Sequence, residues 1–184
     1  MLVDMSYEEL LNYLPAQYKE KDFEDFWIKT LEDTNSEPLN EQIERIDYVV
    51  EQIEAFKVYF DGFSAGRICG YYLLPKTKPP FPVILYFHGY GDNKQKINYY
   101  LKWLLMGYAV FAIDIRGQNG ESFDGRTYPP PSAIGLMTKG VFSKYDYYYR
   151  FVYMDCVKAI NFLEKRNEID IKRFNDNAKN YKEG

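Results

Sequence analysis

Two short apolar patterns with helical spacing open the chain. Ser6-Tyr7-Glu8-Glu9 has the form of a capping box, in which a serine hydroxyl and a glutamate three positions later close the first helical turn, and Pro15 ends this helix. A second helix is predicted from about Asp22, because the apolar residues recur at i, i+3, i+4 and i+8. They form one stripe, made of Phe23, Phe26, Trp27 and Leu31. We expect this N-terminal helical arm, residues 1–36, to pack against other parts of the structure.

The pattern then changes to that of strands. Residues 37–54 are polar and mixed, and predict a connection. Residues 55–63 and 67–74 have the composition of strands, and the turn Ser64-Ala65-Gly66 between them predicts a β-hairpin.

A continuous apolar run, Val-Ile-Leu-Tyr-Phe at residues 83–87, is typical of a central parallel strand covered on both faces. A helical pattern from Lys96 ends at Gly107, and residues 108–114 form a second apolar run. Strand, helix and strand at this spacing predict a βαβ unit.

The rest of the chain begins with a long irregular stretch, residues 114–143. Loops of this length in compact domains are usually functional or disordered. Gly117 and Gly120 in this stretch fit no phosphate-binding motif, and tight turning explains them better. A helix is predicted over residues 145–165, with one face made of Tyr149, Val152, Tyr153, Cys156, Ile160 and Leu163. Residues 174–184 show neither alternation nor an apolar run, so we expect a polar, disordered tail.

Composition narrows the classes of function. A chain of 184 residues with 46% hydrophobic residues is long enough for one domain with a core. The net charge of -4 disfavours nucleic-acid binding.

No apolar run approaches the ~20 residues that cross a bilayer, and the N-terminus lacks the pattern of a signal peptide, so we expect a cytoplasmic protein without a membrane partner. Cys69 and Cys156 have no CxxC spacing and too few companions for zinc, which predicts free thiols and no metal. The 19 tyrosines suit either surfaces that bind carbohydrate or another subunit, or a core that is partly accessible to solvent.

Candidate chemistry follows the apolar run at residues 83–87. Phe87-His88-Gly89-Tyr90-Gly91 is placed as an oxyanion-hole loop is placed, directly after a strand. His88 is the only histidine, and no Gly-x-Ser-x-Gly follows it, so the usual Ser-His-Asp triad cannot be assembled from this chain. A buried ring that holds the loop by hydrogen bonds is the favoured interpretation of His88.

Other polar residues have ordinary explanations. Ser122 and Ser143 lie on predicted loops without a histidine to accept their protons, which leaves a hydroxyl a poor nucleophile. Asp114 at a strand end is expected to pair with Arg116 or to cap the loop rather than to act as a catalytic carboxylate.

Four motifs occur in a fixed order along the chain and resemble one family. The sequence is similar to that of the acetyl xylan esterase/cephalosporin C deacetylase family. The motifs are Asp22-Phe23-Glu24-Asp25-Phe26-Trp27, His88-Gly89-Tyr90-Gly91, Arg116-Gly117-Gln118 and Gly135-Leu136-Met137-Thr138-Lys139-Gly140, and Tyr147-Tyr148-Tyr149-Arg150 extends the likeness.

This resemblance implies an α/β-hydrolase fold that removes acetyl groups from short xylo-oligosaccharides and other small acetyl esters through an acyl-serine, with no metal or organic cofactor. It assigns the backbone N–H of Tyr90 to the oxyanion hole. Family members also form closed oligomers, so a homo-oligomer is a possible assembly.

The chain departs from the family pattern after residues 169–173. The family continues there into a buried strand and a Gly-Gly-Ser-Gln-Gly-Gly elbow, with the acid and the histidine further on, whereas here residues 174–184 are polar. We therefore expect residues 1–173 to form an incomplete α/β-hydrolase domain, truncated before the elbow strand, with an apolar edge bare at residues 83–87 and no catalytic residue of its own. The first hypothesis is the N-terminal portion of a carbohydrate acetyl esterase, inactive alone or one half of a split enzyme with a complementing C-terminal half. The alternative is a non-catalytic module that binds carbohydrate or a partner.

Overall fold

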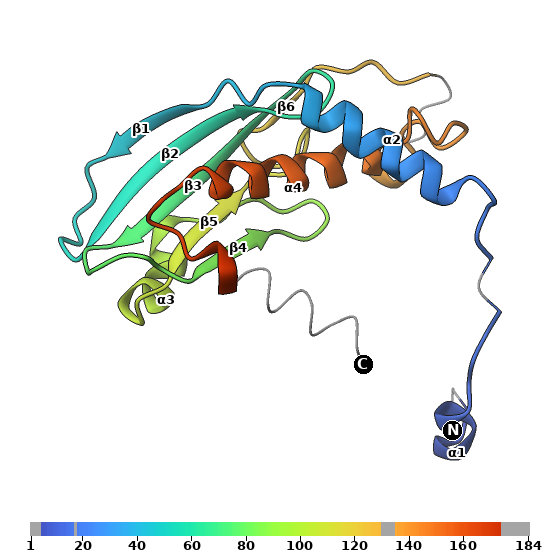
Figure 1. Ribbon diagram of the computed structural model, residues 1–184, viewed down its shortest axis with the longest axis horizontal. Helices are drawn as coiled ribbons and strands as arrows, with labels where there is room; N and C mark the ends of the chain where they lie inside the picture. Colours follow the sequence, from blue (N-terminus) through green and yellow to red (C-terminus); the bar gives the residue numbers. More distant parts are fainter. Residues whose placement is uncertain (1–4, 17, 130–134, 174–184) are drawn as a thin grey trace.

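A mixed six-stranded sheet forms the centre of the computed structural model, which describes residues 5–16, 18–129 and 135–173 (Figure 1). The strands run in the order β1-β2-β3-β5-β4, with β6 pairing β3. They are β1 (Gln42–Ile46), β2 (Ile53–Asp61), β3 (Gly66–Pro75), β4 (Val83–Phe87), β5 (Ala109–Ile113) and β6 (Phe123–Asp124). Only β4 and β5 are parallel, and the other neighbouring strands are antiparallel.

Helices cover both faces of the sheet. The described helices are α1 (Tyr7–Leu11), α2 (Phe23–Ser36), η1 (Ile97–Tyr100), α3 (Leu101–Leu105), η2 (Leu136–Thr138) and α4 (Tyr148–Glu164). Helix α1, whose residues are all exposed, lies away from the sheet (Figure 1). Side chains of α4 form one core with β2, β3 and β5, and side chains of η1 and α3 form a second core on the other face. All five residues of β5 are buried, because alternate residues enter each core. Among the residues described, no helix has the length and apolar character needed to cross a membrane.

The predicted hairpin is confirmed. Strands β2 and β3 pair in antiparallel register from Ile53 with Pro75 to Asp61 with Arg67. The Gly62 N–H donates to Gly66 O at 2.9 Å and closes a three-residue loop, in which Ser64 and Ala65 have φ of 52° and 65°, in the left-handed region. The predicted capping box is also present, with Ser6 and Glu9 bonded to each other's backbone N–H.

The polar connection predicted over residues 37–54 is wrong in part, because residues 42–46 form β1. Four of the five β1 residues are exposed, since the strand lies at the edge of the sheet. Because neither face of this edge strand is buried, its sequence lacks the alternation of apolar and polar residues by which a strand is predicted.

The strand predicted at residues 83–87 exists, but it is not central in the part of the chain described. β4 lies at the edge of the sheet, where β5 is its only strand neighbour among the described residues. Its first four residues are half-buried, and Phe87 is 39% exposed. Just before β4, the Phe81 N–H donates to Glu168 O and the Asp170 N–H to Phe81 O, each at 2.8 Å, which makes a parallel bridge between Phe81 and Ile169. The apolar edge expected from the sequence is therefore present.

The predicted helix faces need correction. In α2 the fully buried residues are Thr30 and Thr34, while Phe23 and Leu31 of the predicted stripe are exposed. Trp27 nevertheless packs against the cluster of Phe63, Phe151 and Met154, so α2 rests on α4. In α4 the buried face includes two charged residues, Asp155 and Lys158. Tyr153, which the prediction placed on the same helix face as Val152 and Leu163, is 54% exposed, whereas those two residues are buried. The tail expected at residues 174–184 lies outside the described residues.

Candidate active site

Two loops meet where the parallel strands β4 and β5 end. In open α/β sheets, ligands bind at the carboxyl ends of the parallel strands, so the loop after β4 (residues 88–95) and the loop after β5 (residues 114–122) define the candidate site. His88, Tyr90 and Asp114, which the sequence singled out, all lie in these loops.

His88 joins the two loops through both ring nitrogens. Its Nε2 accepts a hydrogen bond from the Ile115 N–H at 2.9 Å, and its Nδ1 lies 2.8 Å from Gly89 O. Because Nε2 accepts this hydrogen bond, it carries no proton. The ring proton is therefore on Nδ1, which donates to Gly89 O. With both nitrogens engaged and the ring buried, His88 fixes the loop rather than serving as a general base.

Tyr90 lies in the same loop and is 58% exposed. Its hydroxyl accepts from the Leu136 N–H at 3.0 Å and so connects the loop to η2. Within the described part of the chain, the Tyr90 N–H has no acceptor. The next residue, Gly91, has φ of +72°, a conformation that side chains disfavour.

Gln118 secures the loop from the opposite side. Its Oε1 accepts from the Gly91 N–H at 2.7 Å, and its Nε2 donates to the Tyr148 hydroxyl at 3.1 Å. The Tyr148 hydroxyl in turn donates to Arg116 O at 2.6 Å. Since Asn119 Nδ2 also donates to Gly91 O at 2.5 Å, both backbone groups of Gly91 are held by side chains of the β5 loop.

Asp114 pairs with Lys94, not with Arg116 as one prediction had it. Its fully buried carboxylate accepts from Lys94 N and Nζ, both at 2.6 Å, and from Glu121 N at 2.8 Å. Burial acts to lower the pKa of Lys94, but hydrogen bonds to Asp114 and Glu121 outweigh it and raise that pKa above its usual value. The alternative expectation, that Asp114 caps its loop, fits these contacts. Asp114 therefore has a structural role, and Lys94, which the sequence analysis did not single out, is its counter-ion.

Arg116 pairs with Asp155 of α4 beneath the site. Its Nε and Nη2 each lie 2.6 Å from an Asp155 oxygen, and both side chains are inaccessible to solvent. Burial raises the pKa of the Asp155 carboxyl, against the opposing effect of the Arg116 hydrogen bonds and charge. Asp155 also accepts from the Phe63 N–H at 2.9 Å. This pair ties the β5 loop to α4 and to the β2–β3 hairpin.

The serines that the sequence considered are occupied by structural contacts. Ser122 is buried, where its hydroxyl donates to Asp114 O at 2.7 Å and accepts from the Cys69 N–H at 2.8 Å. Ser143 accepts from the Tyr145 N–H at 3.3 Å in a turn. Neither is placed as a nucleophile.

One Gly-x-Ser-x-Gly does occur before the His88 loop, at Gly62-Phe63-Ser64-Ala65-Gly66, and the sequence analysis treated it only as a turn. The structure places it between two antiparallel strands, whereas a nucleophile elbow joins a strand to a helix. The Ser64 hydroxyl accepts from Arg126 Nη1 at 2.7 Å, and His88 has no free nitrogen to assist it. The pattern is therefore a hairpin turn.

Cys69, Asp114 and Glu121 bring potential metal ligands within 4.8 Å of one another. The Lys94 ammonium already lies between the two carboxylates, 2.6 Å from Asp114 and 2.8 Å from Glu121. Burial raises the pKa of the Cys69 thiol to about 11, so the sulfur stays protonated. The cluster is an ion pair beside a neutral thiol and does not fit a metal.

The model of one family, described as Acetyl xylan esterase (AXE1), matches residues 1–178. The chain belongs to the acetyl xylan esterase family. A curated relative, the acetyl esterase Axe7A of Xylanibacter ruminicola, is 25% identical over 158 residues, which are 81% of this chain and 35% of that protein.

Solved acetyl xylan esterases have the same fold. The enzyme from Paenibacillus sp. R4 superposes with a TM-score of 0.85 at 37% identity, over 90% of this chain and 54% of its own. Acetyl xylan esterase 1 from Thermoanaerobacterium sp. JW/SL YS485 gives 0.84 at 27% identity, over 91% and 53%. The expected α/β-hydrolase fold and family are thereby confirmed, and this chain spans about half the length of these two solved esterases.

Proposed function

We propose that the loop after β4, with Tyr90, supplies the oxyanion-stabilising half of a carbohydrate acetyl esterase site. The observation that carries the proposal is the Tyr90 N–H, which has no acceptor in the described structure and belongs to a loop held by His88 and Gln118. A preorganised donor of this kind stabilises the negative oxygen of a tetrahedral intermediate, and losing one typically costs about 3 kcal/mol of barrier.

The nucleophile, acid and histidine would come from a second segment that pairs along β4. The half-exposed edge of β4 supports this, as does the parallel bridge between Phe81 and Ile169, which begins a strand pairing beside β4. On this proposal residues 1–173 form part of one α/β-hydrolase domain, residues 1–36 are its helical arm, and the described chain is inactive without its C-terminal complement.

The substrates proposed are acetylated xylo-oligosaccharides and other small acetyl esters, including the cephalosporin C type, without a metal or organic cofactor. The family membership supports this substrate class. A cytoplasmic location fits the two free thiols, Cys69 and Cys156, because reducing compartments preserve them. A homo-oligomer, as the resemblance implies, is the proposed assembly of the complete site.

Hydrolysis of p-nitrophenyl acetate tests the proposal. We expect no turnover by the chain alone, and turnover once a second polypeptide carrying the elbow, the acid and the histidine is added. Tyr90→Pro, which removes the N–H, should lower the reconstituted kcat by about 10²–10³-fold. Tyr90→Phe retains the N–H and loses only the hydroxyl contact to the Leu136 N–H, so it should lower kcat far less. Turnover by the chain alone, with a covalent adduct from a serine-directed phosphonate, would contradict the proposal. Equal activity of the two Tyr90 variants would contradict the role of the N–H.

A further inference from the structure

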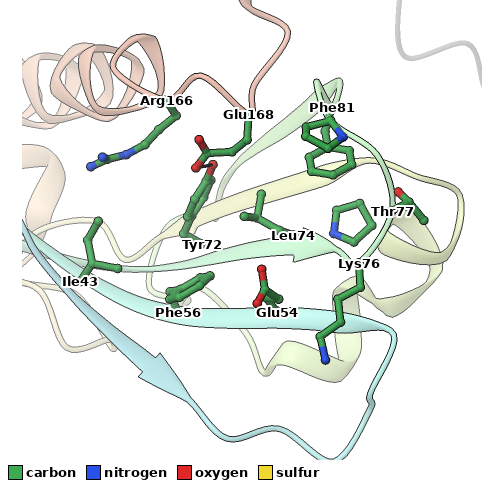
Figure 2. Close-up of a pocket in the computed structure, with 12 residues that line it drawn as sticks. Ile43, Glu54, Phe56, Tyr72, Leu74, Lys76, Thr77, Phe81, Arg166 and Glu168 are labelled. Carbon is green, nitrogen blue, oxygen red and sulfur yellow. Dashed lines mark hydrogen bonds between the residues drawn. The ribbon is translucent and has the colours of Figure 1, made fainter.

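A cavity of about 450 Å³ lies at the other end of the sheet from the Tyr90 loop. Phe81, which lines it, precedes β4, whereas Tyr90 follows β4. Figure 2 shows Phe56 and Glu54 of β2 beside their strand partners Tyr72 and Leu74 of β3, with Glu168, which follows α4, beyond Tyr72. The volume is within the ~300–1,000 Å³ typical of small-molecule sites. The cavity is separate from the candidate active site.

The lining combines flat apolar surfaces with balanced charge. Phe56 provides a half-buried aromatic ring, whose centroid lies 6.3 Å from that of Tyr72, and the Tyr72 ring itself is buried in the core. The charged groups are two carboxylates, Glu54 and Glu168, and two cations, Lys76 and Arg166. An anionic or a cationic ligand would meet repulsion from one of these sets. A neutral polyhydroxylated ligand would instead donate to the carboxylates, accept from the cations and lay its C–H face on a ring.

Two polar groups of the lining are already oriented. The Tyr72 hydroxyl donates to Glu168 Oε1 at 3.0 Å, which fixes the carboxylate above the floor of the cavity. Arg166 lies over the Phe162 ring at 4.2 Å and pairs with Glu41 at 2.7 Å. In the described structure its buried Nε has no hydrogen-bond acceptor. Both groups are therefore held in place by contacts within the described structure.

We propose that this cavity is a second saccharide site, which binds a neutral xylo-oligosaccharide without chemical change. The neutral saccharide class follows from the lining, and only the choice of a xylose-based sugar rests on the proposed function. Binding there would hold a polymeric substrate at a point distant from the reacting acetyl group.

Titration of the chain with xylotriose, followed by calorimetry and by NMR chemical shifts, tests the proposal. We expect saturable binding with shifts concentrated on the cavity residues. Phe56→Leu removes the flat ring and Glu168→Gln replaces one carboxylate oxygen by a donor, and each should weaken binding at least about tenfold. Glu44→Gln, the same change at an exposed position of β1 outside the cavity, should leave affinity unchanged.

Absence of saturable binding, or equal affinity in all variants, would overturn the proposal. Glu168→Gln retains an oxygen to accept from the Tyr72 hydroxyl, so it remains informative if Phe56→Leu fails to fold. The titration uses an unacetylated sugar and the chain alone. Its outcome is therefore independent of whether esterase activity can be reconstituted.

Discussion

Asp155→Asn offers the sharpest test of how the site is supported. The change keeps the shape of the side chain and removes its charge, so one oxygen facing the donors of Arg116 becomes an N–H₂ group. Arg116 is fully buried, and the nearest other carboxylate, that of Asp124, lies 3.6 Å from its Nη1. Leaving one member of a buried ion pair without its partner costs about 3–5 kcal/mol.

Urea denaturation followed by circular dichroism measures this cost. With a slope of about 2 kcal/mol per molar urea, the midpoint should fall by about 2 M. Asp47→Asn, an identical change at an exposed position, should leave the midpoint unchanged. The double variant Arg116→Met/Asp155→Leu should lose less stability than the sum of the two single changes, because neither member of the Arg116–Asp155 pair then remains charged without the other. A loss below about 1 kcal/mol for Asp155→Asn, or strict additivity in the double variant, would refute the reasoning.

Two further substitutions and one labelling experiment probe the same region. Gly66→Ala would place a Cβ 2.4 Å from Arg116 Nη2, and we expect a loss of about 1–3 kcal/mol, whereas an unchanged urea midpoint would show that Arg116 can move aside. With its pKa raised to about 11, the Cys69 thiol should react with iodoacetamide at pH 8 about 100-fold more slowly in the native chain than in denaturing urea; equal rates would contradict its burial. Lys94→Met leaves the buried Asp114 carboxylate without its counter-ion and should cost about 3 kcal/mol, and thermal unfolding at an unchanged midpoint would argue against the pair.

The strands of the βαβ unit and the β2–β3 hairpin could be predicted because apolar runs and turn residues report burial directly. The buried face of α4 could not be predicted in full, because an analysis of hydrophobic periodicity assigns charged residues to the solvent-exposed face. Asp155 is buried by pairing with Arg116, and Lys158 by donating to Glu37 O and Pro38 O at 3.3 and 3.2 Å. These partners are far away in the sequence, and no local pattern identifies them.

The candidate site likewise contains residues that the sequence could identify and a residue that it could not. His88, Tyr90 and Gln118 belong to motifs that the sequence displays, so the loop and its support could be found in advance. The role of Lys94 could not be predicted, because it depends on Asp114, which lies twenty positions later along the chain in the loop after the neighbouring strand β5. Tertiary ion pairs of this kind become visible only when the strand order is known.

The strand order also sets how the chain can fold. β1, β2 and β3 follow one another in sequence and pair as neighbours, so this meander can form through short-range contacts. β5 must then insert between β3 and β4 after the chain has crossed through η1 and α3, which is a contact of longer range and slower formation. Among the described residues β1 and β4 each have one strand partner, so their amide hydrogens that point away from that partner should exchange first with solvent deuterium, while those of β3 and β5 exchange last. The strand that leads into the Tyr90 loop is thus an edge strand of the described sheet, and its order depends on what packs beside it.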